Sequence, residues 1–445
     1  MRWIAKRKCW ELSVIKALIL TPLFLLAHAR AKELEYKSAP PDNPLRGLVP
    51  YVGNAGLGAF PHSMEFKYFA LKHLMKGWGD YDWSSLDGAL EEISSRGKQL
   101  VFRVYIEYPG NGNEMPEFLI KEGVKVTEWQ SNESDGGKMA APDYESPVLR
   151  KAITGFIAAL GKRYDGDPRI AFITAGMLGH WGEWHNYPRE DLWASKEVQL
   201  EVLDAFEKSF PKTKVLLRYP AGEKNRNYAP NAKRPFGFHD DSFGLRTLQT
   251  GRKNDDWHFM GLMAEAGTME SWKQQPIGGE IAPALWIKEF TEHDDKQAED
   301  FGKCVAETHV TWLMDSGMFG ENAMKDKERV ERAEKEVERM GYEYHVSEAS
   351  MIGGKLILTV ENRGVAPFYY QWPVEVSLDG REPIKTDWKT TGILPGEKRK
   401  WEMSISGKPA SIRIRIPNPM QGGKALRFAN HETDGEWLVI DTQGL

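Results

Sequence analysis

Short runs rich in β-branched and aromatic residues alternate with helical segments between residues 46 and 315. This alternation is typical of parallel strand–helix units. The strand-like runs occupy residues 46–52, 66–72, 100–106, 170–176, 214–219, 235–239, 277–281 and 309–314. Helices with capping residues at their starts are predicted over residues 83–97, 146–164, 195–210 and 300–307.

The pattern predicts two domains. Eight strands with intervening helices predict a (β/α)8 TIM barrel over residues 32–340 as the catalytic domain, since such barrels need roughly 250 residues. A doubly wound sheet is the alternative, which the lack of a Gly-rich phosphate loop disfavours. A charged helix over residues 325–340 ends the barrel, and apolar positions then alternate with period two. This change predicts a small antiparallel β-sandwich over residues 341–445 as an accessory domain.

The N-terminal residues predict export. A basic segment is followed by an apolar run from Ala17 to Ala27 and by the small-residue pattern Ala29-Arg30-Ala31. Residues 1–31 are therefore interpreted as a signal peptide, and the mature chain as secreted or periplasmic. The apolar run is short and contains Pro22, so no retained membrane anchor is expected. Cys304 is then the one remaining cysteine, which excludes an internal disulfide.

Charge narrows the classes of partner. Cleavage after Ala31 removes six basic residues and one acidic residue, so the counts of 59 and 64 become 53 and 63 and the formal net charge becomes −10. A nucleic-acid partner would need a basic face, and none is predicted. The sequence also contains no cofactor motif, so no cofactor is expected. The 16 tryptophans favour a carbohydrate-binding surface.

The first candidate site follows the fourth strand. Glu183 stands among aromatic and imidazole side chains that are candidates for substrate binding: His180, Trp181, Trp184 and His185. Aromatic rings beside a carboxyl group disfavour its charged form, as a general acid requires. In a TIM barrel the catalytic residues lie at the carboxyl ends of the strands, where this segment falls. The alternative is that the tryptophans only pack the barrel rim and that Glu183 pairs with an arginine.

A second carboxylate ends the seventh strand. Glu280 follows Gly278 and Gly279, which allow the backbone to pass close to a neighbour. Strands four and seven lie on opposite sides of a barrel mouth, so Glu183 and Glu280 are predicted to face each other across a bound sugar. A retaining glycosidase needs its two carboxyl groups about 5–5.5 Å apart.

On these two positions the chain resembles the clan-A glycoside hydrolases. The resemblance implies that Glu183 is the acid/base and Glu280 the nucleophile. One departure is that the clan usually has Asn directly before the acid/base, where this chain has Gly182. The run 43–47, the Trp-Gly-Glu-Trp segment and the Gly-Gly-Glu segment also resemble a secreted bacterial TIM-barrel family of unknown function.

Further residues of the predicted strands are candidates for substrate binding. They are Arg46, Arg103, Arg218, His239, Asp240 and Trp312. The arginines could hold a carboxylate ionised or bind an anionic sugar, or they could balance buried acids. The loop over residues 109–141 follows the third strand and is predicted to cover the mouth.

Three functions remain open from the sequence. The first is a retaining glycoside hydrolase acting on an oligo- or polysaccharide, and an inverting enzyme that uses Glu183 with Asp240 or Asp241 stays open beside it. The second is a non-catalytic carbohydrate-binding or surface protein. The third is a metal-dependent hydrolase using the histidines with Asp240, although their spacing matches no established metal motif and no metal site is predicted.

Overall fold

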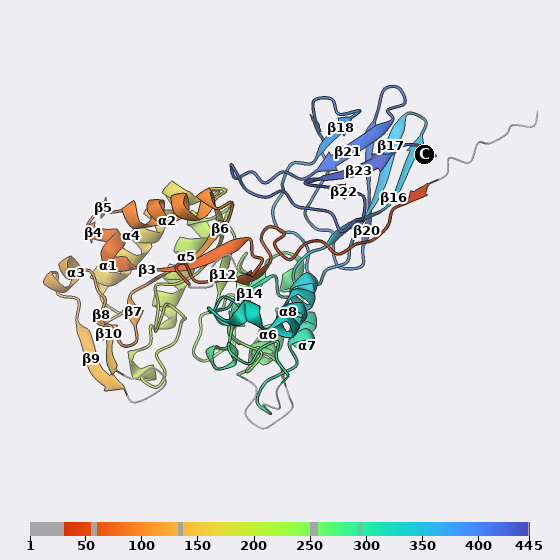
Figure 1. Ribbon diagram of the computed structural model, residues 1–445. Coiled ribbons are helices and arrows are strands. Elements are labelled where there is room, and N and C mark those ends of the chain that lie inside the picture. Colours follow the sequence, from red (N-terminus) through yellow and green to blue (C-terminus); the bar gives the residue numbers. More distant parts are fainter. Residues whose placement is uncertain (1–30, 55–59, 132–136, 250–256, 293–295, 444) are drawn as a thin grey trace, which may run out of the picture.

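The computed structural model describes residues 31–54, 60–131, 137–249, 257–292, 296–443 and 445 (Figure 1). The predicted signal peptide lies outside the described residues except for Ala31. Within the described ranges, no helix is long and apolar enough to span a lipid bilayer.

A parallel barrel forms the first part of the chain, as predicted. Eight parallel strands belong to its sheet among the described residues: β2 (Gly47–Val49), β3 (Met64–Ala70), β6 (Gln99–Tyr105), β11 (Ile170–Thr174), β12 (Val215–Leu217), β13 (Gly237–Phe243), β14 (Ile277–Ile281) and β15 (Trp312–Met314). Each strand pairs with the next along the chain, and β15 pairs with β2. A parallel bridge between Tyr51 and Phe66 joins β2 to β3 and closes the barrel.

Helices surround this barrel, most of them at the predicted places. The longer ones are α2 (Ser84–Ser95), α4 (Pro147–Tyr164), α5 (Lys196–Ser209), α6 (Phe259–Ala266), α7 (Phe301–Thr308) and α8 (Lys327–Arg339). Pro147 opens α4, and the side chains of Ser195, Asp300 and Asp326 cap α5, α7 and α8. Short 3-10 turns cover Glu190–Leu192, Ser271–Lys273, Pro283–Leu285 and Ala323–Lys325. The connection from β12 to β13 contains no α-helix.

The segment after β6 is more ordered than the predicted loop over residues 109–141. It contains short strands and a helix: β7 (Glu107–Tyr108), β8 (Gly112–Asn113), α3 (Glu117–Lys121), β9 (Val126–Ser131) and β10 (Gly137–Pro142). β9 and β10 form an antiparallel hairpin. The Trp129 ring lies 6.1 Å from the His180 ring, so the hairpin packs beside the candidate site. A smaller antiparallel pair, β4 (Met75–Gly77) and β5 (Asp80–Tyr81), follows α1 (Leu71–Leu74).

The C-terminal part is made of antiparallel sheets. In the described chain one sheet has the order β1-β16-β17-β20 and the other the order β19-β18-β21-β23-β22. Their strands are β1 (Lys32–Glu33), β16 (Tyr344–Ile352), β17 (Lys355–Asn362), β18 (Glu375–Leu378), β19 (Ile384–Lys385), β20 (Lys398–Ser404), β21 (Ser411–Arg415), β22 (Thr433–Asp434) and β23 (Trp437–Asp441). Apolar side chains of both sheets, such as Leu358 and Ile412, belong to one buried cluster. The face-to-face packing of a sandwich stays a prediction.

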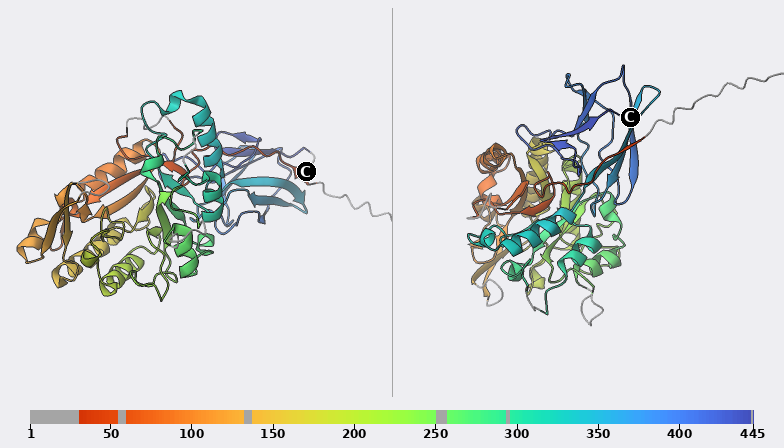
Figure 2. Two further views of the ribbon diagram at one scale, coloured as in Figure 1. Left: turned by 90° about the horizontal axis from the view of Figure 1, so that it is seen from below. Right: turned by 45° about the vertical axis from the view of Figure 1, so that its right-hand side comes forward.

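The C-terminal sheets lie against the end of the barrel where its strands begin (Figures 1 and 2). Tyr370 shows the contact: its hydroxyl donates to the Ala171 carbonyl at 2.6 Å and accepts from the Lys214 amide at 3.0 Å. Barrel-interior residues such as Phe172 share a buried cluster with residues of the sheets. β1 also pairs with β16, so the chain passes from the C-terminal sheet into the barrel. These contacts close the end of the barrel at which its strands begin, which is called the lower end from here on. The opposite end, where the strands finish, is left for the site.

Candidate functional site

Arg103 is the centre of the barrel mouth. It lies near the carboxyl end of β6, and its side chain is fully buried. Its Nη1 donates to Glu183 Oε1 at 3.0 Å, and its Nη2 donates to Asp241 Oδ2 at 2.8 Å. Its Nε donates to the Thr174 hydroxyl at 2.9 Å, and Nη1 also lies 3.3 Å from the Tyr68 hydroxyl. One guanidinium therefore connects residues of β3, β6, β11 and β13 with the segment that carries Glu183.

His239 and Asp241 form a second pair beneath this guanidinium. His239 Nδ1 donates to Asp241 Oδ1 at 2.7 Å. Although burial opposes it, the positive charge of Arg103 and the contact with His239 lower the pKa of Asp241. Burial lowers the pKa of His239. Asp241 is thus a permanent carboxylate that orients Arg103.

The chain around Glu183 is folded into a tight turn. Trp181 and Trp184 adopt left-handed backbone angles, with φ of 52° and 61°. The Trp184 side chain is buried, and its Nε1 donates to the Ala175 carbonyl at 2.8 Å. Trp184 therefore packs the turn and does not contact substrate, which corrects its prediction as a binding residue. The turn holds Glu183 at the mouth, where its side chain keeps 14% exposure.

The backbone at residue 182 explains why this chain has Gly where the clan-A enzymes usually have Asn. Its φ is 73°, and a Cβ there would lie 3.2 Å from the Val104 carbonyl oxygen and 3.3 Å from Arg103 Cδ. A side chain at this position would be strained and would press on Arg103. The sugar contact that Asn provides in clan A therefore has no counterpart at residue 182.

Glu280 lies across the mouth at the end of β14. Its carboxylate accepts a hydrogen bond from the Tyr51 hydroxyl at 2.9 Å. Burial raises its pKa well above the usual range, and the negative charges of Asp241 and Glu183 add to this effect. The structure thus brings Glu183 and Glu280 into one electrostatic environment.

The two glycines before Glu280 have the close neighbours that the sequence indicated. A Cβ on Gly278 would lie 2.3 Å from the Trp312 ring, and one on Gly279 would lie 2.1 Å from the Asp240 carbonyl oxygen. Trp312 is fully buried and stacks on Phe172 at 5.8 Å in the barrel interior. Because it starts β15 and faces this core, Trp312 is a packing residue, and its prediction as a substrate contact is corrected.

Arg46 is also placed away from the mouth. It precedes β2 at the lower end of the barrel and is fully buried. Its guanidinium donates to the carbonyls of Val337, Glu338 and Tyr342 at 3.0, 2.9 and 2.5 Å. Arg46 thus satisfies the last carbonyls of α8. Its prediction as a substrate-binding residue is corrected for this reason.

A second buried acid lies beside the turn that carries Glu183. Glu107 accepts hydrogen bonds from the Tyr144 hydroxyl at 2.5 Å and from Asn186 Nδ2 at 2.8 Å. Burial raises the pKa of Glu107 to about 8. His180 Nε2 lies 3.7 Å from this carboxyl group, and burial, with the charge of His185, lowers the pKa of His180 to about 4. His180 is therefore a neutral residue that fixes the turn.

His185 and Trp181 are the parts of this turn that face the mouth. His185 Nε2 lies 3.8 Å from Glu183 Oε2, and the His185 side chain is 25% exposed. The partly exposed Trp181 ring lies 6.1 Å from the His185 ring. These two rings therefore lie beside Glu183 in the turn.

The remaining predicted residues follow β12 and β13. Arg218 lies at the mouth with its Nη2 3.7 Å from Asp240 Oδ1. Asp240 faces away from Arg103 and accepts from the Ser242 amide and the Thr247 hydroxyl, at 3.0 and 2.7 Å. Burial raises the pKa of Asp240 to about 6. Asp240 is buried within these bonds, and Arg218 stands nearer the centre of the mouth.

Two mouth residues, Tyr51 and Tyr68, do not appear among the candidates chosen from the sequence, and Asp241 is named there only as an alternative to Asp240. Tyr51 and Tyr68 follow or end the first two strands, and Asp241 shares a face of β13 with His239. Side chains alternate along a strand, so His239 pairs with Asp241 and not with Asp240. That alternation was the signal that could have identified Asp241.

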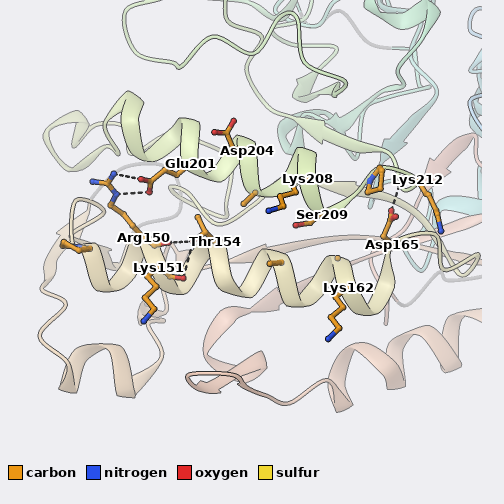
Figure 3. Close-up of a pocket in the computed structure, with 15 residues that line it drawn as sticks. Arg150, Lys151, Thr154, Lys162, Asp165, Glu201, Asp204, Lys208, Ser209 and Lys212 are labelled. Carbon is orange, nitrogen blue, oxygen red and sulfur yellow. Dashed lines mark hydrogen bonds and ion pairs between the residues drawn. The ribbon is translucent and has the colours of Figure 1, made fainter.

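No group of three His, Cys, Asp or Glu side chains in the described part of the chain is arranged to hold a metal ion. A groove of about 1100 Å³ lies between α4 and α5 on the outer wall of the barrel (Figure 3). Arg150 pairs with Glu201 at one end of this groove, which takes no part in the mouth.

No protein-family model matches this chain, and no curated protein matches it. Among the solved structures to which the chain is similar are a xylanase, a mannosidase and a glucanase. Xylanase XynB from Paenibacillus barcinonensis is 8% identical, with 61% of this chain and 83% of that chain covered and a TM-score of 0.33. The exo-β-1,4-mannosidase Op5Man5 from Opitutaceae bacterium strain TAV5 is 10% identical, with 70% and 63% covered and a TM-score of 0.40. The GH5 xyloglucan-specific endo-β-1,4-glucanase XEG5A from a metagenomic library is 7% identical, with 66% and 97% covered and a TM-score of 0.38.

These structures are similar to the chain in fold. The residue assignments therefore depend on the contacts at the barrel mouth.

Proposed function

We propose that this protein is a retaining glycoside hydrolase whose catalytic pair is Glu183 and Glu280. The observation that carries the proposal is the arrangement of two carboxyl groups from opposite sides of the mouth around one buried guanidinium. Glu183 pairs with Arg103 directly, and Glu280 lies within the charge field of both. Two carboxyl groups in different environments are what a double-displacement mechanism at a sugar requires.

The different surroundings of Glu183 and Glu280 determine which of the two carboxyl groups carries a proton before substrate binds. Glu183 accepts from a guanidinium, whereas Glu280 is buried against Tyr51 with a raised pKa. We therefore assign the resting proton to Glu280. Glu280 then protonates the glycosidic oxygen while Glu183 attacks the anomeric carbon, so that the leaving alcohol departs and a glycosyl ester forms on Glu183. The Glu280 carboxylate next takes a proton from water as the water oxygen attacks the anomeric carbon, which breaks the ester bond to Glu183 and restores the proton on Glu280. These roles are the reverse of those that the clan-A resemblance implies.

Aryl glycosides with good and poor leaving groups test the pair and the roles. A panel of such substrates identifies a sugar that is turned over. We expect Glu183→Gln to lower kcat/KM by at least about 1000-fold on every substrate. Glu280→Gln should keep most of its kcat/KM on the best leaving group and lose it on the poor ones, because an acid is needed only for a poor leaving group. Its kcat should fall on every substrate, because the base that activates water in the second step is missing. Added azide should restore turnover in Glu280→Gln alone.

Glu270→Gln is the matched control, because Glu270 pairs with Lys273 on the outer surface. The opposite pattern, with azide rescue of Glu183→Gln, would return the roles to those of the resemblance. Unchanged turnover in both variants would overturn the proposal. Glycan binding without turnover in the wild-type protein would instead favour a non-catalytic carbohydrate-binding protein.

The proposed place of action is outside the cytoplasm, based on the predicted signal peptide over residues 1–31. In this proposal the C-terminal sheets, proposed to form a sandwich, support the barrel at the end opposite the site. Detection of the mature protein in a periplasmic or culture fraction, with Ala31 removed, tests the location.

A further inference from the structure

Arg218 is a buried cation that the protein itself does not fully use. It directly follows β12, so it lies at the carboxyl end of the barrel, and it is 7% exposed. Its guanidinium carbon lies 4.7 Å from the centre of the Tyr219 ring. Tyr219 in turn stacks on Tyr228, with ring centres 4.6 Å apart. The aromatic pair therefore holds the guanidinium in position.

The two acids nearest to Arg218 are already satisfied by other groups. Asp241 accepts from His239 on one oxygen and from Arg103 on the other, at 2.7 and 2.8 Å. Asp240 accepts from Ser242 on one oxygen and from Thr247 on the other, at 3.0 and 2.7 Å. Arg218 approaches these carboxylates only to 3.7 and 4.0 Å. It neutralises charge there but forms no short hydrogen bond.

The donors of Arg218 remain largely available. Its Nη1 makes one long bond of 3.5 Å to the His239 carbonyl, and its buried Nε has no hydrogen-bond partner. A buried guanidinium with unused donors is unfavourable unless a further group completes its hydrogen bonds. Arg103 shows the contrast, because its three nitrogens all have protein acceptors.

We propose that Arg218 binds the carboxylate of a uronic acid residue, and that the substrate is therefore an acidic glycan. The inference rests on the proposed function of the same mouth. A planar guanidinium fork matches a carboxylate with two parallel hydrogen bonds. Arg218 Nε lies 4.0 Å from Asp241 Oδ2, which accepts a hydrogen bond from Arg103, and Arg103 pairs with Glu183, so a sugar held by Arg218 lies beside the catalytic pair. A neutral sugar would leave the buried donors without a strong acceptor.

Paired aryl glycosides that differ only at C6 test this assignment. Glucuronides and galacturonides are compared with the corresponding glucosides and galactosides, in both anomeric forms. We expect kcat/KM for the preferred uronide to exceed that for its neutral partner by about 100-fold. In Arg218→Met this ratio should fall by about 100-fold, and Arg218→Lys should restore only part of it. Arg234→Met is the control, because Arg234 lies in the same β12–β13 connection but pairs with Asp204 and Glu207 outside the mouth.

Binding is measured separately so that the two proposals can fail independently. Calorimetry with oligouronates is carried out on the Glu183→Gln protein and repeated with Arg218→Met added. Binding that requires Arg218 supports the inference even without turnover. Turnover of neutral glycosides alone overturns the inference and leaves the hydrolase proposal standing. A preference for 6-sulfated sugars over uronides overturns the carboxylate assignment, and the absence of both turnover and binding overturns both proposals.

Discussion

The two ends of the barrel each contain a fully buried arginine, and the two arginines bind different kinds of acceptor. Arg46 at the lower end donates only to backbone carbonyls near the end of α8. Arg103 at the mouth donates to the carboxylates of Glu183 and Asp241. Burial lowers the pKa of Arg46, whereas burial is outweighed at Arg103 by the charges of Asp241 and Glu183, which raise its pKa.

This difference shows how the barrel separates stability from chemistry. The lower end is covered by the C-terminal sheets, and there Tyr370 and both terminal nitrogens of Arg46 donate to backbone carbonyls, while the Arg46 Nε has no hydrogen-bond partner. The mouth instead concentrates side-chain charges and retains unused donors at Arg218. Barrel enzymes usually place function at the carboxyl ends of their strands, and the site proposed for this chain lies at the same end.

Replacing Arg103 should have the largest effect on activity. Arg103→Lys keeps the positive charge but cannot bond Glu183, Asp241 and Thr174 together. We expect kcat/KM to fall by about 100-fold or more on the substrate found in the panel. Steady-state kinetics measures the change, and circular dichroism checks that the variant is folded. A loss of kcat/KM below about threefold would show that Arg103 is not essential to the site.

Replacing Arg46 should affect stability and leave activity alone. Arg46→Met leaves carbonyls of α8 and Tyr342 buried without their donor, so the free energy of unfolding should fall by about 3 kcal/mol. Urea unfolding measures this change, and kcat/KM per folded molecule should match the wild type. A drop in kcat/KM comparable to that of Arg103→Lys would erase the distinction between the two ends.

The sequence identifies the strands well because barrel strands are buried on both faces. Their β-rich runs stand out from the helices, whose starts carry Pro147, Ser195 and Asp300. The same runs do not reveal whether a strand residue lies at the lower end of the barrel or at its mouth. Arg46 and Trp312 start their strands, whereas Arg103 lies near the end of a longer one. Strand lengths set that position, and the sequence pattern leaves these lengths uncertain by a few residues.

The sequence pattern also could not predict contacts between segments that are far apart in the chain. Tyr51 reaches Glu280 across 229 residues of chain, and nothing near Tyr51 indicates that partner. The left-handed angles at Trp181 and Trp184 bury one ring and expose the other, although both flank Glu183 in the same way. Such choices follow from the tertiary packing of the turn against β6.

Gly182 offers a sharper test of how the mouth is held. Gly182→Ala should lower the free energy of unfolding by about 1–3 kcal/mol and reduce kcat/KM, because the added Cβ displaces Arg103. Gly123→Ala is the matched control: its φ is 93°, and nothing lies within 4 Å of its Cβ. Both variants carry backbone strain, but only Gly182→Ala should lose activity. Equal activity in the two variants would show that contact with Arg103 is unimportant.

The smallest expected effect concerns pH and the buried pair beside the turn. Glu107 has a folded pKa of about 8 against an ordinary value of 4.5, so its contribution to stability is complete below pH 4.5 and is lost as the pH rises to 8. His180 has a folded pKa of about 4 against 6.5, so its contribution is complete above pH 6.5 and is lost as the pH falls.

The two slopes oppose each other between pH 4.5 and 6.5, and above pH 6.5 the slope of Glu107 remains. Stability should therefore fall from pH 6.5 to pH 8, by at most about 1.4 kcal/mol per pH unit for this one proton. Glu107→Gln should remove that share of the decline, because an amide accepts from Tyr144 without titrating. Urea unfolding at several pH values measures the slope. An unchanged slope in Glu107→Gln would mean that Glu107 is already ionised at neutral pH, and that the turn beside Glu183 holds a buried charge.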